Sequence, residues 1–244
     1  MRPMPGLEAA DRVEPGCYTL RALTTRLYLI RHGATVLSAE DRFAGSTDAE
    51  LSEEGRAQAE RLGERLSGEK LAAVYCSPMK RARDTAAPVG RPHGLSPVSA
   101  DGLREMNHGH WEGLMRLEVE HRYAEEYAAW EADPFTFAPR DGESGLSVMT
   151  RALPAVRMIV LKHESESVAI VSHKATIRLV LCSLLGMDAR GYRDRLDQSP
   201  ACLNVLDFQG PVRARLMLLN DVSHYAAYPR RPGAQLSKWF DAPP

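Results

Sequence analysis

The sequence predicts an α/β protein: a three-layer α/β/α sandwich around a mostly parallel central sheet. Three short apolar runs, at 26–30, 71–76 and 167–172, have the length and composition of buried strands. Stretches with helical periodicity lie between these runs and after the last of them. Strands that alternate with helices favour a parallel sheet with helices on both faces.

Local signals define the helices of the first half. Residues 51–66 predict a helix with Ser52 as its N-cap and acidic residues in its first turn. One face of this helix is expected to pack on the sheet, and it consists of Gly55, Ala59, Leu62 and Leu66. A second helix is predicted over 79–87, directly behind Pro78, where a missing N–H costs little.

Three further helices are predicted in the second half. Residues 114–132 and 145–163 have helical patterns, and Pro154 predicts a kink in the second of them. The strongly apolar stretch 173–185 predicts a buried helix that Gly186 closes.

The last elements and the two ends set the predicted domain boundaries. Residues 202–208 and 212–220 flank a Gln-Gly-Pro turn and predict a late antiparallel hairpin. Prolines, glycines and scattered charges predict an N-terminal extension at 1–25 and a Pro-rich tail at 229–244. The domain between them is predicted at 26–228.

Composition excludes several classes of protein. The 244 residues carry 31 basic and 32 acidic side chains, a net charge of -1, whereas nucleic-acid binders are distinctly basic. No apolar run approaches the roughly 20 residues that span a bilayer, and the charged segment 8–14 does not fit a signal peptide. We therefore expect a cytoplasmic protein with no nucleic-acid or membrane partner.

The four cysteines, Cys17, Cys76, Cys182 and Cys202, form no Cys-x-x-Cys pair, so a zinc site is not expected. Cys76 and Cys182 lie in apolar segments and are expected to be small buried hydrophobic residues. The histidines at 108, 110 and 121 also lack the spacing of a common zinc motif. The sequence thus predicts neither a metal nor a cofactor.

Polar residues follow three predicted strands at the point where each strand ends. Arg31-His32-Gly33 follows the first, Ser77-Pro78 leads to Arg81 after the second, and Ser172-His173 follows the third. In open α/β sheets, ligands bind beyond the carboxyl ends of the strands. The sequence therefore predicts a polar site at this edge of the sheet.

The residue types in these segments suit attack on a phosphomonoester. The dianionic phosphoryl group must be neutralised before a nucleophile can approach, and the planar fork of arginine matches phosphate oxygens. Arg31 and Arg81 are candidates for that role, and His32 is the candidate nucleophile, because imidazole accepts phosphoryl groups well. Gly33 is expected to offer its N–H to the anion, and His173 to add a further contact.

The leaving alkoxide also needs a proton donor, and Glu105 is the candidate general acid. Glu112 and Glu118 compete with it but fit a surface position equally well. Trp111 and Trp130 are expected to be packing residues.

Six segments in this order resemble the histidine phosphatase superfamily, also called phosphoglycerate mutase-like. They are LIRHGAT, RFAGSTDAELSEEGRAQA, SPMKRARDTA, LREMNHGHWEG, DGES and VSHKATIR, and the resemblance runs from about Leu27 to His224. It implies a phosphorylated His32, a phosphate pocket of Arg31, Arg81 and His173, and Glu105 as the proton donor that later activates water.

The resemblance also implies residues around the pocket. Thr35, Ser38, Ala44 and Gly45 fall where family members line the substrate mouth, and Asn220 and His224 match a C-terminal motif that supports the site.

The chain departs from the family pattern at two places. Ser38 stands where an asparagine is usual, and Lys174-Ala175 replaces two glycines. Lys174 adds a cation at the rim, so we expect a preference for substrates with a second anionic group.

Three functions fit this pattern. The first is a metal-independent phosphomonoesterase that hydrolyses small phosphorylated metabolites through a phosphohistidine. The short gap between Glu105 and His173 and the NHGHWEG segment favour it over a cofactor-dependent phosphoglycerate mutase. The third is an inactive phosphate-binding or signalling module, against which His32, Glu105 and His173 argue. An oligomer is compatible with the sequence.

Overall fold

A six-stranded mixed sheet runs through the middle of the molecule, in the strand order β3-β2-β4-β1-β5-β6. The computed structural model describes residues 24–37 and 42–226. The strands are β1 (Thr25–Arg31), β2 (Leu71–Cys76), β3 (Val98–Ser99), β4 (Ser167–Ser172), β5 (Leu203–Gln209) and β6 (Arg213–Asp221). Strands β3, β2, β4 and β1 pair in parallel, and the hairpin of β5 and β6 continues the sheet with antiparallel pairings.

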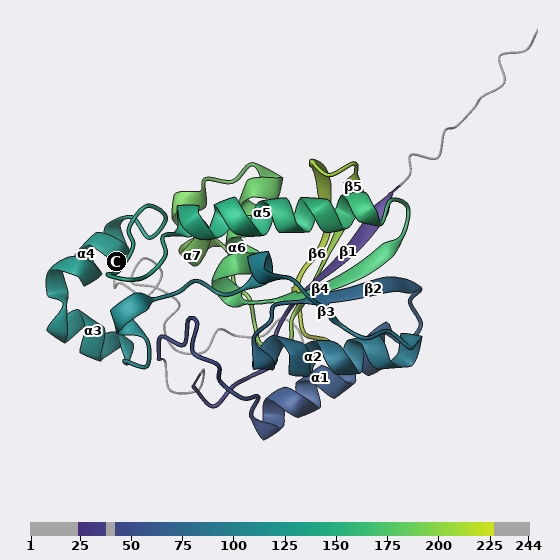
Figure 1. The fold of residues 1–244 in the computed structure, drawn as a ribbon, viewed down its shortest axis with the longest axis horizontal. Coiled ribbons are helices and arrows are strands. Elements are labelled where there is room, and N and C mark those ends of the chain that lie inside the picture. Colours follow the sequence, from purple (N-terminus) through teal and green to yellow (C-terminus); the bar gives the residue numbers. More distant parts are fainter. Residues whose placement is uncertain (1–23, 38–41, 227–244) are drawn as a thin grey trace, which may run out of the picture.

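Helices cover both faces of the sheet, which confirms the predicted three layers (Figure 1). Helices α1 (Glu53–Leu66) and α2 (Lys80–Gly90) pack on one face, and α5 (Gly145–Lys162) and α6 (Lys174–Leu185) on the other. Because successive side chains of a strand point to opposite faces, Leu27 and Leu29 of β1 join the core under α5 and α6. Tyr28 and Ile30 join the core under α1 and α2.

A third, separate cluster lies at one end of the molecule, beside the short helices α3 (Arg116–Arg122) and α4 (Ala124–Ala132). Its buried members are Phe43, Trp111, Val119, Tyr127 and Trp130, and we call it the aromatic cluster. The packing role predicted for the two tryptophans is thereby confirmed.

The predicted local signals operate in the structure. The Ser52 hydroxyl caps α1 by accepting a hydrogen bond from the Gly55 N–H at 3.1 Å. Gly186 closes α6 in the left-handed conformation, with φ at 66°. Helix α5 continues through Pro154, and Cys76 and Cys182 are fully buried.

The long helix predicted at 114–132 is wrong: two helices, α3 and α4, meet at Tyr123, whose backbone is not helical. Tyr123 packs edge-on against His110, with ring centroids 4.5 Å apart, and against the aromatic cluster. The helix is thus interrupted at Tyr123, where the ring packs against other parts of the fold, although residues 114–132 contain no glycine or proline.

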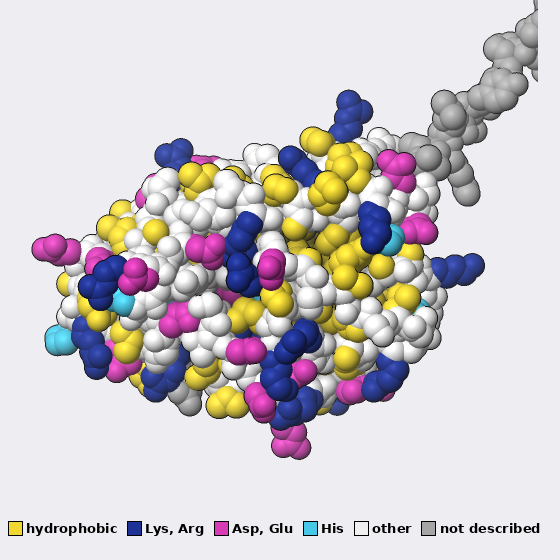
Figure 2. Space-filling view, in the orientation of Figure 1, with side chains coloured by type: hydrophobic (Ala, Val, Ile, Leu, Met, Phe, Trp, Pro, Cys, Tyr) yellow, Lys and Arg dark blue, Asp and Glu magenta, His cyan; other side chains and the backbone are white. Residues whose placement is uncertain are grey.

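The predicted extension 1–25 and tail 229–244 lie almost wholly outside the described residues, so these boundaries stay predictions. Within residues 24–37 and 42–226, no helix is both long and apolar enough to cross a membrane. Figure 2 shows acidic and basic side chains interspersed over the face in view, in keeping with the net charge of -1.

Candidate active site

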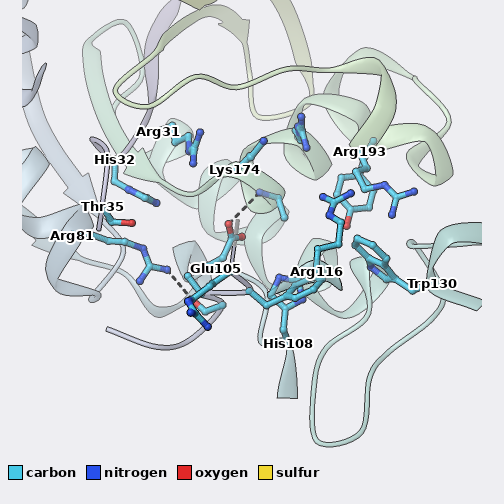
Figure 3. Close-up of a pocket in the computed structure, with 17 residues that line it drawn as sticks. Arg31, His32, Thr35, Arg81, Glu105, His108, Arg116, Trp130, Lys174 and Arg193 are labelled. Atoms are coloured by element: carbon cyan, nitrogen blue, oxygen red, sulfur yellow. Dashed lines mark hydrogen bonds between the residues drawn. The ribbon is translucent and has the colours of Figure 1, made fainter. Parts of the chain in front are cut away.

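The carboxyl ends of β1, β2 and β4 bring the predicted site residues together around one cavity of about 220 Å³ (Figure 3). Arg31 and His32 reach it from the end of β1, and Arg81 from the first turn of α2. Glu105 comes from the loop after β3, and Lys174 from the start of α6. Segments far apart in the sequence thus converge as predicted.

His32 presents an unprotonated nitrogen. Its ring is 6% exposed, and Nδ1 lies 2.8 Å from the carbonyl oxygen of Gly33. A carbonyl only accepts hydrogen bonds, so Nδ1 carries the proton and Nε2 keeps its lone pair. Burial, together with the nearby guanidinium groups of Arg31 and Arg81, holds the pKa of His32 well below 6.5. The ring is therefore neutral at neutral pH, as a nucleophile must be.

His173 has the opposite tautomer. Its Nδ1 accepts a hydrogen bond from Arg81 Nε at 3.3 Å, so in the neutral ring the proton sits on Nε2. Nε2 is buried and has no hydrogen-bond partner among the described residues. The ring is fully buried behind the cavity wall, edge-on to His32 with ring centroids 5.0 Å apart. Burial, and then His32 and Arg81, hold the pKa of His173 well below its ordinary value. The pair thus offers one acceptor and one donor.

Arg81 orders the surroundings as well as facing the cavity. It is 2% exposed, and besides His173 it donates to the carbonyl oxygens of Gly45 and Thr47, both at 2.7 Å. A guanidinium has five N–H donors, so Arg81 retains two for a ligand. The arginine therefore fixes the loop at 45–47 and the His173 ring at the same time.

Arg31 is held by the loop before β5. It donates to the carbonyl oxygen of Gln198 at 2.6 Å, while its Nε is buried without a partner in the described part of the chain. Asn220 fixes this loop, because its Oδ1 accepts from the Ser199 N–H at 2.6 Å. His224 instead contacts Arg65, at 3.3 Å. The C-terminal motif thus reaches the site through Asn220, which steadies the partner of Arg31.

Glu105 sits at the N-terminus of α6. Its carboxylate accepts hydrogen bonds from the N–H groups of Ala175 and Thr176, both at 3.2 Å. The Thr176 hydroxyl lies 3.1 Å from the carboxylate and donates its proton to the carbonyl oxygen of Arg104 at 2.7 Å. Helix N-termini favour negative charge, so this position orients the side chain. Figure 3 shows it between Arg81 and Lys174, on the cavity wall.

The expectation that Gly33 offers a free N–H is wrong. That N–H donates to Thr85 Oγ1 at 3.0 Å, and Gly33 does not line the cavity. Its lack of a side chain serves packing, because a Cβ here would lie 2.5 Å from the carbonyl oxygen of Gly55 in α1. The predicted mouth residues Thr35, Ala44 and Gly45 do line the cavity, while Ser38 falls outside the described residues.

Lys174 is half-buried on the cavity wall and forms no ion pair or hydrogen bond within the described part of the chain. Burial, and then the neighbouring charges of Arg178 and Arg31, lower its pKa from 10.5 to about 7. The amine is therefore poised between its two protonation states when the cavity is empty.

The sequence did not predict the side of the cavity that lies away from His32, which we call the far wall. The lining residues that were not predicted are Arg42, Phe43, His108, Arg116, Trp130, Ala175, Arg178, Tyr192 and Arg193. Only Arg178 carried a local signal, since it lies four residues after Lys174 and so on the same helix face.

Glu112 was also underrated as a plain surface residue. Its carboxylate accepts from the Ser46 N–H, from the Ser46 hydroxyl and from the Thr47 hydroxyl, at 2.6, 2.7 and 2.7 Å. Burial acts against ionisation, but these hydrogen bonds outweigh it and lower the pKa of Glu112. Glu112 and Arg81 therefore both stabilise the loop at 45–47 by hydrogen bonds.

No group of three or more His, Cys, Asp or Glu side chains within the described ranges is placed to hold a metal ion.

Fold and site define a class: α/β proteins with an anion pocket of histidines and arginines at the carboxyl edge of the sheet. The family model of the histidine phosphatase superfamily (branch 1) matches residues 27–222. The chain belongs to this superfamily, and its relatives place it in the phosphatase branch.

Several curated relatives are named as phosphatases, and two of them illustrate the similarity. Phosphoserine phosphatase 1 of Hydrogenobacter thermophilus is 34% identical over 163 residues, 67% of this chain and 77% of that protein. A glucosyl-3-phosphoglycerate phosphatase of Mycolicibacterium vanbaalenii is 35% identical over 170 residues, 66% of this chain and 75% of that protein. The chain spans 57% of a bifunctional protein of Mycobacterium tuberculosis, with 34% identity over 212 residues.

Solved structures agree with this assignment. Bacillus stearothermophilus YhfR has a TM-score of 0.77 at 32% identity, covering 82% of this chain and 98% of that one. The mycobacterial glucosyl-3-phosphoglycerate phosphatase has a TM-score of 0.74 at 29% identity, covering 81% and 99%. These similarities support a phosphoric monoester hydrolase.

Proposed function

We propose that the protein is a metal-independent phosphomonoesterase that hydrolyses small phosphorylated metabolites through a phosphohistidine at His32. The observation that carries the proposal is the pair of opposite tautomers. His32 Nε2 has a free lone pair beside the cavity, and His173 Nε2 has a proton without an acceptor. We expect a phosphoryl group bound at His32 to engage both rings: its phosphorus accepts the lone pair of His32, and one of its oxygens accepts the hydrogen bond of the adjacent, buried His173.

Two steps account for hydrolysis. In the first, His32 Nε2 forms a bond to phosphorus, the phosphorus–oxygen ester bond breaks, and Glu105 gives a proton to the leaving alkoxide. In the second, Glu105 takes a proton from water, the water oxygen attacks phosphorus, and the bond to His32 breaks. Arg31, Arg81 and the His173 N–H stabilise the charge on the phosphoryl oxygens in both steps.

Cavity size favours a small substrate. Its volume of about 220 Å³ lies below the roughly 300–1,000 Å³ typical of pockets for drug-sized ligands. Mutase activity remains the alternative, because it shares the first step and differs only in what accepts the phosphoryl group.

The deciding experiment is a panel of phosphorylated metabolites assayed with EDTA present and with His32→Ala as the control. We expect phosphate release by the wild type, none by the variant, and an acid-labile phosphoenzyme in rapid quench. Isomerisation of 3-phosphoglycerate without phosphate release would favour the mutase. Binding of phosphate without turnover of any ester would favour the inactive module, and loss of activity with EDTA would refute metal independence.

A further inference from the structure

We propose that the cavity holds a second anion subsite, formed by Lys174 and Arg178 with Arg116 opposite, which selects small phosphomonoesters that carry a carboxylate. This inference rests on the proposed function and names its substrate class. The phosphoryl group occupies the His32 end, and the carboxylate occupies the end near α6.

Charge is the first argument. Seven cationic side chains line the cavity, against the single carboxylate of Glu105. A phosphoryl dianion held by Arg31 and Arg81 would offset the charge of these two arginines and leave the charge of the other lining cations without a counterion in the ligand. Of these, Arg193 pairs with Glu131 at 3.0 Å and Arg42 with Glu118 at 3.8 Å, so both have acidic partners in the protein. Lys174 has no acidic partner among the described residues, and Arg178 lies four residues further along the same helix, so positive charge gathers on this face of α6.

Free donors are the second argument. Lys174 has neither an ion pair nor a hydrogen bond inside the described ranges. Arg178 is 5% exposed, forms an ion pair with Asp197 at 3.6 Å through Nη2, and has a buried Nε without a partner among the described residues. These two side chains share one face of α6, so a single anion can meet both. Buried donors without acceptors are costly, which makes a ligand the natural acceptor.

Electrostatic repulsion is the third argument. Besides burial, it is Arg178, Arg31 and Arg116 that lower the pKa of Lys174, while only Asp197 among the largest contributors raises it. The cations around Lys174 thus repel one another in the empty cavity. An anion at this place would relieve the repulsion and retain the proton on the amine.

Size selects the kind of anion. Both groups must belong to one small molecule, since the cavity measures about 220 Å³. A carboxylate is smaller than a second phosphoryl group and matches the planar donors of Arg178.

The test compares 3-phosphoglycerate with glycerol 3-phosphate, which differ by a carboxylate in place of a hydroxymethyl group. We expect the wild type to prefer 3-phosphoglycerate by about tenfold or more in kcat/KM, the range of a charged hydrogen bond. Lys174→Met should bring this ratio towards one, and Lys174→Arg should restore much of it. Lys162→Met, an exposed lysine of α5, is the matched control and should keep the wild-type ratio.

A wild-type ratio near one, or a ratio that Lys174→Met leaves unchanged, would overturn the subsite while leaving the phosphatase proposal intact. A stronger preference for 1,3-propanediol bisphosphate would overturn the carboxylate assignment. If neither ester is turned over, the phosphatase proposal fails separately. Calorimetric affinities of the wild type for the same two ligands then decide the subsite, and equal affinities would refute it.

Discussion

Replacing Lys174 with methionine should stabilise the empty protein at neutral pH, and the gain should shrink as the pH rises. The lysine has a pKa of 10.5 in the unfolded chain and about 7 in the folded protein. Between these two values the unfolded chain binds more protons, so the stability of the wild type rises with pH. The destabilisation by Lys174 is therefore complete below pH 7 and absent above pH 10.5. Methionine keeps the length of the side chain and does not titrate.

The size of the effect follows from the shift of the pKa. At about 1.4 kcal/mol for each pKa unit, Lys174 lowers the free energy of unfolding by about 4 kcal/mol at pH 7 and by about 2 kcal/mol at pH 9. The difference between the variant and the wild type should thus fall by about 2 kcal/mol across this interval. Changes in packing do not depend on pH and cancel in that comparison.

Urea unfolding at the two pH values, in buffers free of phosphate, measures the difference directly. Lys162→Met serves as the control, because it makes the same substitution at an exposed lysine of α5 that does not line the cavity. A difference in stability that stays constant from pH 7 to pH 9, or grows, would refute the reasoning about Lys174. In that case the amine is charged at neutral pH without a penalty.

Three further outcomes test other parts of the site. The imidazole NMR signals of His32 should not titrate near pH 6.5, because burial and two guanidinium groups keep the ring neutral; a midpoint there would contradict its assignment as a neutral nucleophile. Glu112→Gln should lower the stability by about 1–3 kcal/mol and raise KM more than it lowers kcat, since the amide cannot accept all the hydrogen bonds of the Ser46 loop; thermal melts and kinetics measure both, and an unchanged KM would show that the loop does not depend on it. Gly33→Ala should destabilise by at least about 1–3 kcal/mol, since its Cβ meets the backbone of α1, whereas Gly68→Ala points into open space; equal melting temperatures for the two would contradict the packing argument.

Most of the fold could be predicted because its central strands are buried on both faces. In the sequence, such strands are continuous apolar runs. The predicted bounds of β1, β2 and β4 agree with the structure to within one residue at each end. β3 has no such signature, because it is two exposed residues held at the edge by β2. The break at Tyr123 was not predicted for a related reason: what accompanies it is the packing of the Tyr123 ring on His110 and on the aromatic cluster, which no local sequence signal shows.

The residues of the site likewise fall into those that the sequence could predict and those that it could not. Arg31 and His32 follow directly from strand ends, so sequence position alone brings them to the cavity. Trp130 and Arg193 come from helices outside the central sheet, and their arrival depends on how these helices pack. Gly33 shows the limit within a correctly predicted segment, since whether its N–H was free depended on Thr85, which lies in α2, far along the chain.

The aromatic cluster gives the far wall of the cavity a small core of its own. Phe43 and Trp130 belong both to that core and to the wall, whereas His32 directly follows β1 and Arg81 lies in α2. Substitutions around α3 and α4 can therefore reshape the far wall of the cavity without altering the elements that carry His32 and Arg81.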